Sequence, residues 1–163
     1  MTRINSAIPV EHLTDEHLLA EHLLAEHREI KRIPACFDKT NFNTLYKRIP
    51  DKFCLGPGHV TFFFDKLKFT FDRYLAIHAE CLKRGFDVAD YRDSWFNVKN
   101  FLYFDYNWRD YVPTAEEKEL LIERISLRIN ESSKPCFHYY GKPISKLEAI
   151  KLLTQDEQHF GTS

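Results

Sequence analysis

A carboxylate set among basic residues is the first feature of this sequence that could do chemistry. Glu29 lies in the run Arg28-Glu29-Ile30-Lys31-Arg32. On a helix, Arg28 and Arg32 share a face because they are four residues apart, and the neighbouring positive charges favour the ionised form of the carboxyl. Such a carboxylate could stabilise a cationic sugar transition state and then accept a proton in a β-elimination. The same pattern also describes a solvated helix end with ordinary ion pairs.

The second reactive group is the amine at the N-terminus. Thr2 follows Met1, and because threonine is small we expect Met1 to be removed and the α-amine of Thr2 to be exposed. An α-amino group has an ordinary pKa of about 7.7–8.0, well below that of lysine, so more of it is the free base at neutral pH. A free amine can attack a sugar carbon or an aldehyde and form a Schiff base. Because nearly every protein has an N-terminus, the amine alone does not indicate a catalytic role, and further features of the sequence are needed to support one.

A repeated pentapeptide suggests a different chemistry. Glu16-His17-Leu18-Leu19-Ala20 is followed directly by Glu21-His22-Leu23-Leu24-Ala25 and then by Glu26-His27. Histidine and glutamate four residues apart could offer two ligands to a metal ion, so a metal-dependent hydrolase is one alternative. Successive histidines of the repeat are rotated by about 140° around a helix, however, and do not share a face. A solvated amphipathic helix is the better interpretation, and no metal site is expected.

Hydrophobic periodicity and capping residues place these groups on helices. We expect a helix over 14–33, capped by Thr14 or Asp15 and followed by Pro34. The clearest apolar pattern predicts a helix over 59–84 that ends at Gly85. Further elements are expected as a short helix near 41–48, an extended piece at 101–106, a helix over 114–130, a loop over 132–142 and a last helix over 145–157. With no convincing sheet, the sequence predicts an all-α fold.

The composition is that of a globular protein with one domain. The chain has 163 residues, of which 44% are hydrophobic and 29% are charged. It contains no run of about 18 apolar residues that could span a membrane, and its start lacks the apolar segment of a signal peptide. The four cysteines are widely spaced and are expected to be reduced thiols. We therefore expect a cytoplasmic location.

The charge of the chain is unevenly distributed. The net charge is −1, which does not by itself predict nucleic-acid binding. Residues 38–84 hold nine Lys/Arg and five Asp/Glu, a net of +4, whereas residues 11–34 hold three bases and six acids, a net of −3. A local basic face can bind phosphates on a neutral protein. The aromatic residues between 91 and 111 could stack on bases, although such residues more often fill a core.

Several sequence blocks resemble the phage-type pyrimidine dimer DNA glycosylases. Three of them are Met1-Thr2-Arg3-Ile4-Asn5, the Arg28–Arg32 run, and Leu55-Gly56-Pro57-Gly58-His59-Val60-Thr61-Phe62-Phe63-Phe64-Asp65-Lys66-Leu67. Ala79–Phe86 and Tyr139–Lys142 are two further similar blocks. The resemblance implies a compact single-domain helical fold whose N-terminal arm reaches the active site. It covers roughly 1–145, and 146–163 is expected to be a C-terminal helical extension of the same domain.

The resemblance also implies a bifunctional glycosylase and abasic-site lyase. The α-amine of Thr2 would attack the sugar of the 5′ pyrimidine of an ultraviolet dimer and form a Schiff base, and β-elimination would cut the strand, with Glu29 as the essential carboxylate. The implied DNA-binding residues are Arg3, His22, Arg28, Arg32, Lys83, Arg124, Arg128, Tyr139, Tyr140 and Lys142. The implied partner is double-stranded DNA with cyclobutane pyrimidine dimers or abasic sites, bound by a monomer without metal, cofactor or membrane.

The sequence departs from the family pattern in two places. The stretch between Asn5 and Arg28 is longer than in the family by more than a helical turn, mostly because of the repeated pentapeptide, and five residues lengthen a helix by about 7.5 Å. If the insert simply lengthens the helix, Thr2 must fold back to meet Glu29. The aromatic segment also differs, with Cys136-Phe137 where the family has a tryptophan. A second hypothesis is a non-catalytic module that binds damaged DNA, in which the longer stretch has displaced Thr2 from Glu29.

Overall fold

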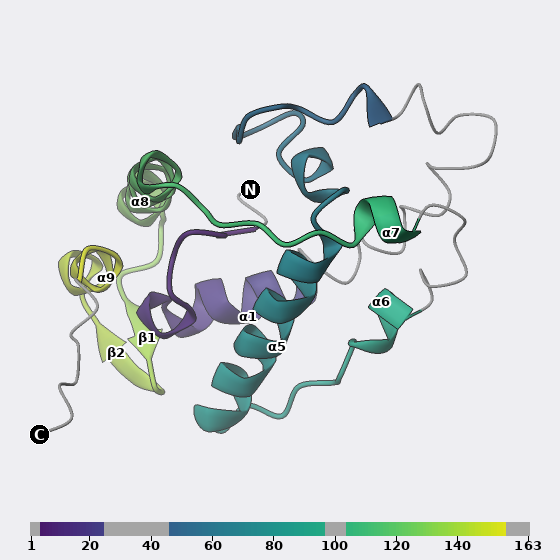
Figure 1. Cartoon of the computed structure of the whole chain (residues 1–163). Coiled ribbons are helices and arrows are strands. Elements are labelled where there is room, and N and C mark those ends of the chain that lie inside the picture. The colour runs from purple at the N-terminus through teal and green to yellow at the C-terminus, as the bar shows by residue number, and fades with distance from the viewer. Residues whose placement is uncertain (1–3, 25–45, 97–103, 156–163) are drawn as a thin grey trace, which may run out of the picture.

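The computed structural model describes residues 4–24, 46–96 and 104–155. Helices predominate, and the only sheet in this part of the chain is one small hairpin (Figure 1). In chain order the elements are the 3₁₀ helix η1 (Val10–His12), α1 (Asp15–Leu24), the 3₁₀ helix η2 (Thr61–Phe63), α5 (Leu67–Lys83), α6 (Asp93–Phe96), α7 (Phe104–Asn107), α8 (Ala115–Glu131), β1 (Phe137–Tyr139), β2 (Lys142–Ile144) and α9 (Lys146–Leu153). The predicted all-α class is confirmed.

The main core lies where α1, α5, α8 and α9 meet. α1 packs across α5 (Figure 1), and Leu18 of α1 is buried with Ile77 of α5. α8 adds Leu121, Ile125 and Ile129, which recur every four residues and so line one face of the helix. Burying each such side chain contributes roughly 1.5–3 kcal/mol. This core fixes the helices that carry the residues of the candidate site.

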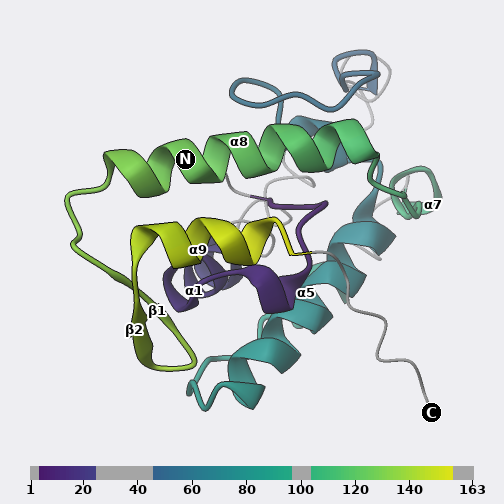
Figure 2. The same ribbon diagram turned by 90° about the vertical axis from the view of Figure 1, so that its left-hand side faces the viewer.

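α8 and α9 lie side by side, joined at one end by the hairpin (Figure 2). The hydroxyl of Thr114 accepts a hydrogen bond from the Glu117 amide and caps α8, and Ser145 forms a capping box with Glu148 at the start of α9. Both predicted helix starts are thereby confirmed. α9 ends at Leu153 rather than at 157, because Thr154 leaves the helical conformation and its hydroxyl donates to the Lys151 carbonyl.

The predicted loop over 132–142 is wrong in part, because it contains β1 and the first residue of β2. The strands pair antiparallel, with Phe137 opposite Ile144 and Tyr139 opposite Lys142. Tyr140 and Gly141 connect them with φ of 51° and 75°, as in the type I′ turns that favour tight hairpins. Strands of three residues are too short to show the alternating pattern that identifies a strand in a sequence.

The helix predicted over 59–84 begins later than expected. Lys66 is not helical (φ −127°, ψ 43°), and α5 starts only at Leu67. Two of the aromatic residues before it, Phe62 and Phe63, belong to η2 and form a separate cluster with Ile4. The continuous apolar pattern over 59–84 thus comes from two separate elements, η2 and α5. The predicted end is confirmed, since Gly85 follows α5 with φ 85°.

The remaining expectations meet the structure only in part. The extended piece at 101–106 is wrong for its described residues, because Phe104–Asn107 is a helix. Of the helix expected over 14–33, the part to residue 24 is confirmed, and the rest, like most of 41–48, lies outside the described residues. Trp95 is buried and donates from Nε1 to the Thr70 hydroxyl, which confirms a core role for this aromatic. None of the described helices is long and apolar enough to cross a membrane.

Candidate active site at the N-terminal arm

The N-terminal arm is held against α1 by a buried carboxylate. The Asn5 amide donates to Oε1 of Glu21 at 3.0 Å, and Nδ2 of Asn5 donates to Oε2 at 2.9 Å. Glu21 is only 2% exposed, so both carboxylate oxygens are turned away from water. The contact joins residues 16 positions apart in the chain and fixes the arm at Asn5.

Arg73 of α5 balances the charge of that carboxylate. Its Nε donates to Glu21 Oε1 at 2.6 Å and its Nη2 donates to Oε2 at 3.0 Å, which makes a bidentate pair. Nη1 also donates to the Ile8 carbonyl at 3.0 Å. Burial by itself raises the pKa of the Glu21 carboxyl, but the charge and hydrogen bonds of Arg73, together with those of Asn5, outweigh it and hold the pKa below its ordinary value. Glu21 is therefore charged and has a structural role, and it is not available as a base. We call the ion pair of Glu21 and Arg73 the clamp.

A cleft of about 280 Å³ opens beside the clamp, between α1, α8 and β1. Arg128 and Lys134 bring positive charge to it, and His17 and Phe137 form part of its wall. Burial, and next the charge of Arg124, lowers the pKa of Arg128, but an arginine stays charged at any ordinary pH. Glu16 and Glu21 also line the cleft, and Glu21 is already paired with Arg73. The cleft therefore holds two cations beside the Glu16 carboxylate, close to the fixed end of the arm, and cations of this kind can contact a phosphate.

His17 brings a neutral imidazole to the same cleft. Its Nδ1 lies 2.7 Å from the Thr14 hydroxyl, and its ring stacks on Phe137 with centroids 5.7 Å apart. Burial lowers its pKa, despite the opposing charges of Glu16 and Glu21. A neutral imidazole can both accept and donate a proton. In the sequence, the repeated pentapeptide suggests His17 only as a metal ligand. No cluster of three or more metal-binding side chains occurs among the described residues.

The residues predicted to do the chemistry lie outside the described part of the chain. These are Thr2 and Glu29, together with the predicted DNA contacts Arg3, Arg28 and Arg32. Covalent geometry still bounds the amine, because three peptide links of at most about 3.8 Å each join Thr2 to Asn5. The described end of the arm thus determines which part of the molecule the Thr2 amine can reach.

The other predicted DNA contacts occupy several surfaces. Arg128 lines the cleft and Arg124 lies one turn earlier on α8, half-buried. Lys83 at the end of α5 and Lys142 of β2 are exposed. His22 is completely buried, with Nε2 3.1 Å from His78 Nδ1 and 3.3 Å from the Tyr74 hydroxyl. Its ring faces α5 in this structure, and a role in binding DNA stays a prediction.

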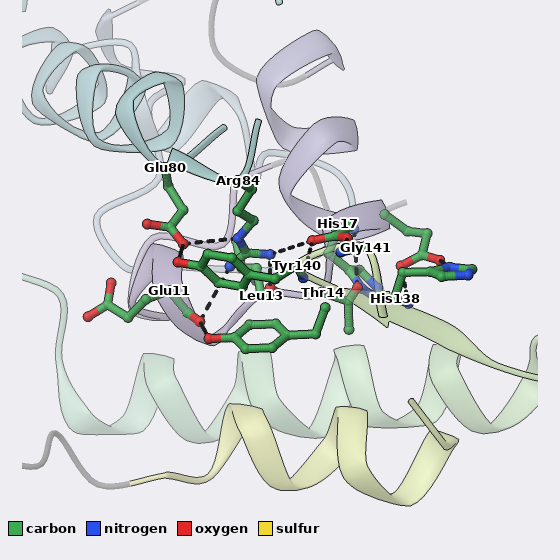
Figure 3. Close-up of polar contacts among 12 residues, drawn as sticks. Glu11, Leu13, Thr14, His17, Glu80, Arg84, His138, Tyr140 and Gly141 are labelled. Atoms are coloured by element: carbon green, nitrogen blue, oxygen red, sulfur yellow. Dashed lines mark hydrogen bonds and ion pairs between the residues drawn. The ribbon is translucent and has the colours of Figure 1, made fainter. Parts of the chain in front are cut away.

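Tyr139 and Tyr140 lie against a buried arginine. Figure 3 shows Arg84 beside Glu80 and Tyr140. The guanidinium carbon is 4.8 Å from the centroid of each tyrosine ring, and the Tyr140 hydroxyl donates to Glu80 at 2.7 Å. Arg84 itself pairs with Glu80 and with Asp15, both at 2.9 Å. The two tyrosines thus anchor the hairpin to α1 and α5, and contact with DNA stays a prediction for them too.

Sequence reasoning missed the roles of Arg84, Glu21 and Arg73. The spacing of Glu80 and Arg84 by four residues was a visible signal for an ion pair on one helix. Nothing local marks Glu21, because the repeat offers Glu16 and Glu26 in the same setting. Its partner lies 52 residues away, and only the tertiary fold selects it.

A comparison with known protein families identifies the family of the chain. A family model described as pyrimidine dimer DNA glycosylase matches residues 1–93, which is more than half of the 163 residues. The chain therefore belongs to the pyrimidine dimer DNA glycosylase family. Membership implies a DNA repair glycosylase whose substrate is DNA containing pyrimidine dimers. The matched range includes both halves of the clamp, Glu21 and Arg73.

Proposed function

We propose that this glycosylase is also an abasic-site lyase, with the α-amine of Thr2 as its nucleophile. The observation that supports the proposal is the fixed end of the arm. Asn5 is held by a buried ion pair next to a cleft with two cationic residues. An enzyme that uses its N-terminus must restrict that end of the chain, because a reacting amine has to approach its target to within about 3–3.5 Å.

The proposed chemistry proceeds in two stages. The amine nitrogen bonds to the anomeric carbon of the 5′ pyrimidine nucleotide, and the glycosidic bond breaks with its electron pair leaving on the base nitrogen. The attacking nitrogen loses one of its two protons. The sugar ring then opens, its ring oxygen takes a proton, and the nitrogen, which keeps its other proton, becomes part of a cationic imine. A base then removes a proton from the sugar carbon next to the imine, and the 3′ phosphate leaves. We assign the removal of that proton to Glu29.

The phosphates on each side of the lesion would be held by basic residues. Arg128 and Lys134 line the cleft, and Arg3, Arg28 and Arg32 are near the proposed nucleophile and base in the sequence. Contacts of this kind position the duplex and make binding sensitive to salt. Extrusion of a nucleotide costs a few kcal/mol and less at a damaged site, which favours the lesion.

We further propose that the protein acts in the cytoplasm as a monomer.

Substitution of Glu29 tests the assigned base. Glu29→Gln keeps the size of the side chain and removes its basicity, so strand cleavage at an abasic site should be lost while binding to the same duplex is kept. Glu26→Gln is the matched control, because it makes the same change three residues earlier. Unchanged cleavage by Glu29→Gln would refute this role. Binding without cleavage by the unaltered protein would instead support the non-catalytic module.

A further inference from the structure

His59 is a buried polar residue with a fixed orientation. It is only 4% exposed and lies just before η2, in a turn where its amide donates to the Gly56 carbonyl at 3.1 Å. Phe53 and Phe63 make T-shaped contacts with its ring, with centroids 5.3 and 5.7 Å away. The ring cannot rotate freely between these aromatic neighbours, so its two nitrogens point at defined partners.

The two ring nitrogens connect a loop to the N-terminal arm. Nδ1 lies 2.9 Å from the Cys54 carbonyl oxygen. A carbonyl only accepts, so Nδ1 carries the proton and Nε2 of the neutral ring is an acceptor. The Ile4 amide donates to that Nε2 at 3.3 Å. The Ile4 carbonyl is 3.1 Å from the same nitrogen, and it accepts a hydrogen bond only when the ring is doubly protonated.

The arm is thus held at two consecutive residues by two different parts of the chain. His59 binds the backbone of Ile4, and Glu21 binds Asn5 at 3.0 Å. The Ile4 side chain is itself buried against Phe62 and Phe63. The Glu21 contact fixes where the arm leaves α1, whereas the His59 contact acts one residue closer to the N-terminus. After Ile4, only Arg3 separates this grip from Thr2.

We propose that His59 is a positioning residue that aims the N-terminal amine at the sugar. The inference rests on the proposed function, because it concerns the placement of the same nucleophile. A misplacement of about 1 Å can slow a reaction by roughly 100-fold. Release of the Ile4 amide leaves the arm fixed at Asn5 but frees the part that leads to Thr2. Loss of His59 therefore lowers the rate of imine formation and leaves the affinity for DNA nearly unchanged.

Two substitutions distinguish the contribution of the Nδ1 hydrogen bond from that of the Nε2 hydrogen bond. In His59→Asn the side-chain amide replaces Nδ1, so the link to the Cys54 carbonyl is kept and the arm is released. In His59→Gln the amide reaches the position of Nε2, so the arm is held and the loop link is lost. If His59 only supported the loop, His59→Asn would be the milder change. If it positions the arm, His59→Gln is the milder one.

The experiment is single-turnover borohydride trapping on an abasic-site duplex, with the full chain at saturating protein. We expect His59→Asn to trap the imine about 10- to 100-fold more slowly, His59→Gln to stay within about threefold of the unaltered protein, and the dissociation constants to agree. Equal rates for all three proteins, or a His59→Gln as slow as His59→Asn, would overturn the inference. Failure of the unaltered protein to trap would refute the proposed lyase itself.

Hydrogen exchange of the Ile4 amide gives a readout that does not depend on activity. This amide should be protected in the unaltered protein and in His59→Gln, and should exchange rapidly in His59→Asn, while the Asn5 amide stays protected in all three. Thermal unfolding of each variant shows whether the fold is kept. A protected Ile4 amide in a folded His59→Asn would overturn the inference, whatever the trapping rates.

Discussion

Glu21→Gln is the substitution that tests the buried clamp most severely. Glutamine keeps the volume of the side chain and can still accept from Asn5, but it leaves the charge of Arg73 without its counterion. The Glu21 and Arg73 side chains are 1% and 8% exposed. Removing one partner of a buried ion pair costs about 3–5 kcal/mol. A domain is stable by only about 5–15 kcal/mol, so the variant should be folded but markedly weakened.

The assay is thermal unfolding followed by circular dichroism at pH 7. In a protein of this size 1 kcal/mol corresponds to about 2–4 °C, so the midpoint should fall by roughly 6–20 °C. The double variant Glu21→Met with Arg73→Met is the control, because it removes both charges and leaves an apolar pair of similar size. It should recover much of the lost stability. A loss below about 1 kcal/mol in Glu21→Gln would refute the clamp, since that is the value of an exposed pair.

The stability lost in Glu21→Gln should depend on pH in a defined direction. The pKa of Glu21 is lower in the folded protein than in the unfolded chain, so the ion pair contributes fully above the ordinary glutamate pKa of about 4.3. Its contribution is lost as the pH falls through the lower pKa of the folded state. The difference in stability between the unaltered protein and Glu21→Gln should therefore be constant near neutral pH and shrink in acid. A difference that grew in acid would contradict the direction of the shift.

Three further changes have defined outcomes. Arg84→Met should lower the free energy of unfolding in urea by about 3 kcal/mol, because it leaves the buried carboxylates of Asp15 and Glu80 without their cation. A loss below about 1 kcal/mol would mean that water hydrates these carboxylates. Ser145→Ala should cost about 0.5–2 kcal/mol through the broken capping box with Glu148, and an unchanged midpoint would contradict it. Arg128→Ala should reduce the salt dependence of DNA binding by about one phosphate contact. An unaltered slope would remove Arg128 from the DNA interface.

The parts of the fold that sequence could predict are those fixed by local chemistry. The helix starts expected at Thr114 and Ser145 are fixed locally, because each hydroxyl accepts a hydrogen bond from an amide only three residues away. Gly85 was a recognisable stop because its positive φ suits glycine. The hairpin was not predictable from periodicity, since strands of three residues show no pattern. The start of α5 was obscured because η2 supplies apolar residues in helical spacing for a different cluster.

The candidate site likewise has residues that the sequence indicates and residues that only the tertiary fold brings together. Family blocks pointed to Thr2, Glu29 and the arginines, and these predictions stay untested by the described residues. The ion pair of Glu21 and Arg73 could not be predicted, because the two residues are 52 positions apart and the repeat offers three glutamates in the same setting, Glu16, Glu21 and Glu26. His59 was visible as part of a motif, but its role depends on Ile4, 55 residues away. Long-range polar contacts of this kind leave no local pattern in a sequence.

The most direct test of the proposed lyase is borohydride trapping on an ultraviolet-irradiated duplex, with undamaged and abasic-site duplexes beside it. Mass spectrometry should first show that Met1 is absent and that the new N-terminus is not acetylated. We predict a covalent adduct on irradiated and abasic DNA, mapped to the α-amine of Thr2, and none on undamaged DNA. An adduct mapped to a lysine, or no adduct from a protein with a free Thr2 amine, would contradict the proposed mechanism.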